Sequence, residues 1–98
     1  MKLVEALPDL VADLESPLAH LGRGDLIAQL RAATLKSWKY DEFANTTLLE
    51  LSGTDSAEIF SLWDEAGVNL ELDHQGVVCR IEVLQGEHLA KRLRDDAR

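Results

Sequence analysis

Residues 67–84 limit the fold more than any other stretch, because apolar and polar side chains alternate on both sides of one turn. Before the turn, the apolar positions are Val68, Leu70 and Leu72. After the turn, they are Val77, Cys79, Ile81 and Val83. A repeat of two residues is typical of a strand that buries one face. The sequence therefore predicts a β-hairpin with one apolar face.

The turn of this hairpin, residues 73–76, has the side chains that a chain reversal needs. The Asp73 carboxylate can accept a hydrogen bond from the backbone two residues on. Gly76 can adopt the left-handed conformation of a tight hairpin. We therefore expect a positive φ at Gly76 and expect this hairpin to be the most stable element.

Residues 1–33 predict an antiparallel helical hairpin. Leucines recur every three or four residues, as in a helix with one buried stripe, at positions 3, 7, 10, 14, 18 and 21. Pro8 suits the first turn of a helix over about 8–21, and Pro17 predicts a kink within it. A break at 22–25 precedes a second helix, and the short link makes the two helices antiparallel.

Residues 34–84 predict a mainly antiparallel sheet of about four strands. Strand-like stretches at 35–40 and 47–51 accompany the two arms of the hairpin. Residues 56–66 fit either a short helix or an edge strand. A short polar helix is expected at 86–98. The expected fold class is α+β, with the N-terminal helical hairpin packed on the sheet in a single domain of 98 residues.

The composition predicts a soluble, cytoplasmic protein. We see neither a signal-peptide pattern nor an apolar run of the roughly 20 residues that cross a bilayer. The single cysteine, Cys79, cannot form an internal disulfide. Its place on the apolar face of a strand predicts a buried, unreactive thiol.

The net charge of −8 is concentrated in the middle of the chain. Residues 41–82 contain ten acids and one base, so this segment alone holds −9. Such a surface repels phosphate backbones, and we expect it to bind no nucleic acid. It attracts a basic partner or cations, although the same charge also serves solubility alone.

The sequence shows no constellation typical of an enzyme. His20, His74 and His88 have no metal-ligand spacing, which leaves open only a zinc site assembled in three dimensions. No serine lies in a nucleophile motif, and a buried thiol is a poor nucleophile. Glu71 and Asp73 share a strand face, where solvation explains them better than acid–base catalysis. We therefore predict no enzymatic activity and no cofactor.

The five aromatic residues all lie within residues 38–63. They predict packing between helices and sheet or, where a ring lies on an open face or edge, an anchor for a partner. The candidate interaction residues are Trp38, Tyr40, Phe60 and Trp63. Small sheets with open edges can pair edge to edge, so we expect a homodimer.

Parts of residues 38–84 resemble a widespread bacterial family of small α+β proteins that is catalogued as a domain of unknown function. The resemblance rests on Trp-Lys-Tyr-Asp-Glu-Phe-Ala-Asn from position 38, on the following strand, and on the hairpin that ends in Ile-Glu-Val-Leu. Typical members read Tyr-Asp-x-x-Ala-Asp, a strand, and then Asp-x-x-Gly-x-Val-x-Gly-Ile-Glu-Ile-Leu. Here Asn45 and Arg80 stand where members usually have Asp and Gly.

The resemblance implies no known enzyme activity, and it implies an extended segment at 58–63. It also implies a role beside another protein, because some members neighbour small basic toxin-like proteins. The sequence as a whole predicts a non-catalytic protein–protein interaction domain, in its sharpest form an antitoxin-like acidic partner of a basic protein. The alternative is a small-molecule or metal-binding protein with a pocket between helices and sheet. No membrane is expected among its partners.

Overall fold

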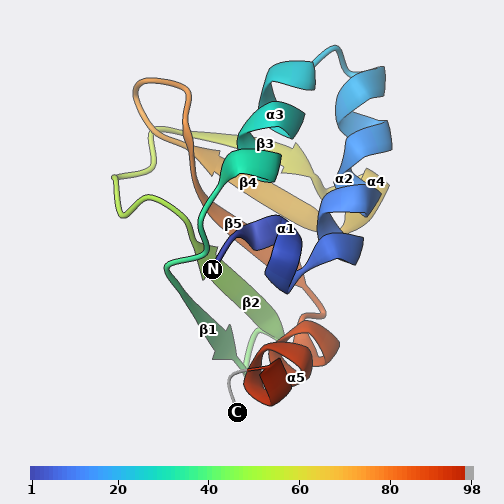
Figure 1. Cartoon of the computed structure of the whole chain (residues 1–98), viewed down its shortest axis with the longest axis vertical. Helices are drawn as coiled ribbons and strands as arrows, with labels where there is room; N and C mark the ends of the chain where they lie inside the picture. Colours follow the sequence, from blue (N-terminus) through green and yellow to red (C-terminus); the bar gives the residue numbers. More distant parts are fainter. Residues whose placement is uncertain (97–98) are drawn as a thin grey trace.

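The computed structural model describes residues 1–96 and has an α+β fold (Figure 1). The helices are α1 (Leu3–Ala6), α2 (Pro8–His20), α3 (Gly24–Ala32), α4 (Trp63–Ala66) and α5 (Glu87–Asp96). The strands are β1 (Ser37–Asp41), β2 (Thr46–Glu50), β3 (Glu58–Leu62), β4 (Val68–Leu72) and β5 (Val78–Leu84).

All five strands form one antiparallel sheet in the order β1-β2-β5-β4-β3. The β1–β2 hairpin lies beside β5, and β3 is added on the far side of the β4–β5 hairpin. Strand β5 is therefore the centre of the sheet, and β1 and β3 are its two edges.

Helices α1, α2, α3 and α5 cover one face of the sheet, and the hydrophobic core lies between the two layers (Figure 1). The helical layer contributes four buried members of the predicted leucine stripe, Leu3, Leu7, Leu14 and Leu18, together with Leu26 and Leu30 of α3. Of the other two stripe positions, Leu10 is half-buried and Leu21 is exposed. The strands contribute alternate positions, including the fully buried Leu49, Leu70 and Ile81. The remaining strand positions form the opposite face, which we call the open face.

The predicted α+β class is confirmed, with differences in detail. The sheet has five strands instead of four, because residues 56–66 contain both predicted alternatives, with β3 followed directly by α4. Gly67 then ends α4 with a φ of +66°. The last two residues of the predicted C-terminal helix, 97 and 98, lie outside the described residues.

The N-terminal helices also follow the prediction closely. Pro8 begins α2, and Pro17 lies inside it. The sequence did not separate the one-turn helix α1, which ends where Leu7 leaves helical geometry with a φ of −136°. The backbone N–H of Leu3 donates to the carbonyl of Ala33 at 2.9 Å, so α1 is held beside the end of α3.

The β4–β5 hairpin has the predicted turn chemistry. Gly76 has a φ of +78°. The Oδ1 atom of Asp73 accepts hydrogen bonds from the N–H of Gln75 at 2.8 Å and the N–H of Val77 at 3.0 Å. These bonds, the one from Val77 first, lower the pKa of Asp73 from its usual value.

A β-bulge changes which residues of β5 face the core. The register between β4 and β5 shifts by one residue, which leaves Cys79 without an opposite partner. Val78 and Cys79 are both buried, whereas Val77 is exposed. The predicted burial of Val77 is therefore wrong, because the extra residue interrupts the two-residue repeat.

A close contact fixes the start of α5 against β2. A Cβ atom on Gly86 would lie 2.3 Å from Oγ1 and 2.8 Å from the backbone N of Thr47. The Thr47 hydroxyl donates to the carbonyl of Gly86 at 2.8 Å. Only glycine fits between β5 and α5 at this point, because the atoms it meets belong to the backbone and to a β-branched side chain.

Candidate interaction surface

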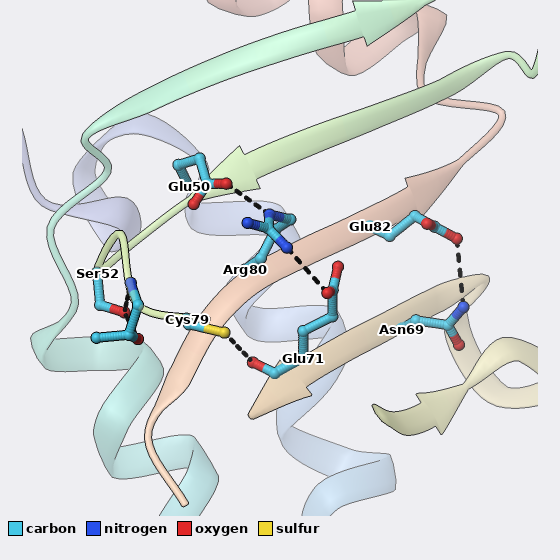
Figure 2. Close-up of polar contacts among 8 residues, drawn as sticks. Glu50, Ser52, Asn69, Glu71, Cys79, Arg80 and Glu82 are labelled. Carbon is cyan, nitrogen blue, oxygen red and sulfur yellow. Dashed lines mark hydrogen bonds and ion pairs between the residues drawn. The ribbon is translucent and has the colours of Figure 1, made fainter. Parts of the chain in front are cut away.

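The open face carries an ion-paired arginine at its centre (Figure 2). Arg80 on β5 lies opposite Glu50 on β2 and opposite Glu71 on β4. Its Nε donates to Oε1 of Glu50 at 2.5 Å, and its Nη1 donates to Oε1 of Glu71 at 2.9 Å. One guanidinium thus ties three neighbouring strands together.

This cluster has one more carboxylate than it has cations. The hydrogen bond to Glu50 raises the pKa of the Arg80 guanidinium above its ordinary value. The arginine is therefore always charged, and it offsets only one of the two glutamates. Among the described residues, the buried Oε2 of Glu50 has no hydrogen-bond partner.

A second polar contact lies beside the cluster on the same face (Figure 2). The Nδ2 of Asn69 donates to Oε1 of Glu82 at 3.3 Å, in the pairing of β4 with β5. The Oδ1 of Asn69 is buried and finds no partner within residues 1–96. The centre of the open face is therefore rich in hydrogen-bond acceptors and poor in donors.

The edge strand β3 adds apolar surface to this face. Ile59 lies opposite Glu71 in the β3–β4 pairing, and 62% of it is exposed. Trp63, which directly follows β3 and begins α4, is 43% exposed. In the part of the chain that the structure describes, β3 pairs with β4 alone, so its outer side has no neighbouring strand.

Four exposed acids surround this apolar surface: Asp55, Glu58, Asp64 and Glu65. Asp55 precedes β3, and Glu58 is its first residue. Asp64 and Glu65 lie in α4, which directly follows β3. We call β3, Trp63 and these acids the β3 edge surface. It combines an apolar centre with negative charge at both ends, as at a protein-binding site with a polar rim.

The structure separates the four predicted aromatic residues into two pairs at opposite edges of the sheet. Trp38 and Tyr40 lie on β1, half-buried, and the guanidinium of Arg94 on α5 lies 5.9 Å from each ring. Phe60 is half-buried on β3 below Arg23, whose guanidinium lies 5.0 Å from the ring. Of the four, Trp63 alone is exposed.

The sequence missed a further exposed aromatic residue. Phe43 is 98% exposed in the β1–β2 turn. The Asp41 carboxylate accepts hydrogen bonds from the N–H of Phe43 and of Ala44, which shapes the turn. The polar neighbours of Phe43 in the sequence are the signal that could have placed it in a solvated turn.

A groove of about 400 Å³ lies between α3 and the sheet, as the pocket hypothesis requires. It is lined by Gln29, Ala32, Ala33, Leu51, Ser52, Val77 and Val78. The amide of Gln29 is already engaged at both ends. Its Nε2 donates to the carbonyl of Gly76 at 3.1 Å, and its Oε1 accepts from the N–H of Val78 at 2.8 Å. The groove therefore offers mainly apolar contact.

Side chains of the kinds that bind metal ions do not cluster within the described residues. Residues 1–96 contain no group of three or more His, Cys, Asp or Glu side chains placed to hold a metal ion. Cys79 is buried, its Sγ donates to the carbonyl of Glu71 at 3.2 Å, and burial raises the pKa of the thiol. None of the helices in this range has the length and apolar character needed to cross a bilayer.

Comparison with known proteins gives no match to a family model, to a curated protein or to a solved structure. The resemblance of residues 38–84 to a small bacterial family stays a prediction.

Proposed function

We propose that this chain is a non-catalytic protein–protein interaction domain that binds a basic protein through the β3 edge surface. The supporting observation is that two large apolar side chains, Ile59 on the edge strand β3 and Trp63 directly after it, are exposed among four exposed acids. An exposed apolar patch with a charged rim is the usual mark of a binding surface.

The charge of the surface favours a basic partner. The acid-rich segment 41–82 supplies all four rim acids, and the neighbouring open face has the uncompensated carboxylate of the Arg80 cluster. A partner with lysine and arginine residues would meet complementary charge at both ends of β3, which increases the association rate and opposes acidic competitors.

The pocket alternative has weaker support. The groove beside α3 has the expected position, but both ends of the Gln29 amide already form hydrogen bonds with the backbone. A small-molecule site needs several convergent polar groups that fix the ligand's orientation. Thermal-shift screening against a metabolite library tests this alternative, because a ligand of the groove would raise the melting temperature.

A second copy of the chain is another possible occupant of β3. Antiparallel pairing of two β3 strands would place Asp55 and Glu58 of one copy near Asp64 and Glu65 of the other. This repulsion opposes a homodimer at low salt, and salt weakens the repulsion. Homodimerisation stays a prediction, and its test is given in the Discussion.

The experiment for a basic partner is affinity capture from a lysate of the encoding organism with charge-matched variants. One variant carries Asp64→Lys and Glu65→Lys at the β3 edge surface. The control carries Glu5→Lys and Asp13→Lys, two exposed acids on α1 and α2. Both variants change the net charge equally, so they differ only in where the charge is lost.

We expect the wild type and the control to capture a basic protein. The variant with Asp64→Lys and Glu65→Lys in α4 should not capture it. Moderate salt should also release this protein. Capture of acidic or neutral proteins only, or equal capture by both variants, would contradict the proposal.

A further inference from the structure

We infer that the partner binds by adding one extended segment to β3 as a sixth strand of the sheet. This inference rests on the proposed function, and it specifies how the partner is held. Strand addition uses backbone hydrogen bonds for affinity and alternate side chains for specificity.

The backbone of β3 is suited to receive a strand. Residues 58–62 contain neither proline nor lysine, the residues that commonly block an edge. All five residues of β3 are in regular register with β4, from Glu58 opposite Leu72 to Leu62 opposite Val68. A regular edge presents its outer N–H and C=O groups at the spacing that another strand requires.

The side chains of β3 define what that strand would contain. On the open face, an added strand would contact Ile59 and Ser61. On the helix face, it would contact Phe60, the half-buried ring under Arg23. Phe60 at the middle of β3 and Ile59 beside it are apolar, so the middle of the added strand should be apolar on both faces.

The ends of the added strand face acids. Glu58, with Asp55 before it, lies at one end of β3, and Asp64 and Glu65 lie at the other. Cross-strand pairs of opposite charge stabilise a sheet, and like charges destabilise it. The structure therefore assigns to the partner a short segment that is apolar in the middle and basic at both ends.

A capped synthetic peptide, Lys-Lys-Val-Ile-Val-Lys-Lys, is the probe for this mode. It is titrated into the isotopically labelled full chain, and backbone amide shifts are followed by NMR. Two analogues serve as controls. One has its three central amides N-methylated, which keeps charge and side chains but removes backbone donors. The other has glutamate in place of every lysine.

The expected shifts centre on residues 58–66, with new protection from hydrogen exchange in β3. N-methylation should weaken binding by about tenfold or more, because one or two backbone hydrogen bonds to β3 are lost. The glutamate analogue should not bind. Ile59→Lys should abolish binding, whereas Glu5→Lys, at an exposed position on α1, should leave it unchanged.

Different failures separate the two proposals. Equal binding of the N-methylated peptide would overturn strand addition and leave a charge-based interaction standing. Absence of binding by the parent peptide, with a basic protein still captured through α4, would also overturn strand addition alone. A third outcome is that the chain is a dimer and that the peptide binds only after the dimer dissociates. In that case a second copy of the chain occupies β3, and the inference is wrong.

Discussion

The two edge strands of the sheet, β1 and β3, have the same length but different surroundings. On β1, Trp38 and Tyr40 lie under Arg94, so the chain's own last helix covers the aromatic side of this edge. Lys39 is exposed in the middle of the strand. On β3, Ile59 is exposed beside the middle residue, and the acids lie at the first position of the strand and beyond its two ends.

This difference separates an edge that the fold protects from one that it leaves available. A lysine in the middle of an edge strand disfavours pairing with another chain, and a docked helix shields the rings beside it. Neither device is present within residues 58–62. Aromatic residues in strands therefore do not by themselves indicate a binding site. What matters is whether the fold leaves them, and the strand edge beside them, uncovered.

The largest expected effect on stability comes from a substitution that displaces α5, the helix that covers β1. Gly86→Ala would place a Cβ against the backbone of Thr47 and force α5 away from β2. We expect a loss of about 2–3 kcal/mol in the free energy of unfolding, as in overpacked cores. Urea denaturation followed by tryptophan fluorescence measures it.

Gly24→Ala is the matched control for this variant. Gly24 begins α3, and a Cβ there would meet no atom within 4 Å. The control should change stability by less than about 1 kcal/mol, in the stabilising direction, because alanine is the better helix former. Equal stability of Gly86→Ala and wild type would show that α5 does not depend on this contact.

The second prediction weakens the other half of the sheet. Gly76→Val places a β-branched residue at a φ of +78° in the turn on which β4 and β5 depend. We expect a loss of about 1–2 kcal/mol. Hydrogen exchange should show faster opening of β3 and β4 than of β1. An unchanged unfolding free energy would contradict the assigned turn.

The third prediction concerns pH and the loop that leads into β3. The Asp73 carboxylate also accepts from the Thr54 hydroxyl at 3.1 Å, and its pKa is lowered from the usual 3.8. A carboxyl group whose pKa is lower in the folded state stabilises the fold at any pH above its pKa in the unfolded chain. This contribution is lost as the pH falls through the pKa of the folded state. Asp73→Asn should therefore be less stable than wild type near neutral pH.

The same difference should disappear as the pH falls through the lowered pKa of Asp73, because the wild-type carboxylate is then also protonated. Denaturation midpoints measured across this range decide the matter. A destabilisation of Asp73→Asn that is independent of pH would show that the charge of Asp73 makes no contribution.

The smallest expected effect on stability comes from Trp63→Ala, which tests whether the open edge self-associates. If two copies pair through β3 in the absence of a partner, light scattering should show more dimer at moderate salt than at low salt, because the acids near β3 repel their copies. Trp63→Ala should lower the dimer fraction with little change in unfolding. A mass of 10.9 kDa at high concentration in moderate salt would contradict homodimerisation.

The sequence was sufficient where neighbouring residues determine the structure. The turn at Asp73 and Gly76 could be predicted because it needs one side-chain acceptor and one positive φ. The start of α2 followed from Pro8, and the helical hairpin followed from the leucine stripe. Each of these features depends on contacts within a few residues.

The remaining features depend on distant contacts. The separation of Trp38 and Tyr40 from Phe60 and Trp63 follows from the strand order, which periodicity does not contain. The bulge at Cys79 is visible only in the pairing of β4 with β5. β3 was ambiguous because it is short and runs directly into α4, so two periods overlap within eleven residues, 56–66.

The glycine at the start of α5 also determines when this helix can form its contacts. Thr47 and Gly86 are 39 positions apart, and the β2–β5 pairing brings them together. Contacts between distant positions form late, since the chain must first close a long loop. During synthesis, α5 also leaves the ribosome after all five strands. The helix that covers β1 therefore docks after the sheet has formed. Until it docks, both edges of the sheet, β1 and β3, are open to pairing with other chains.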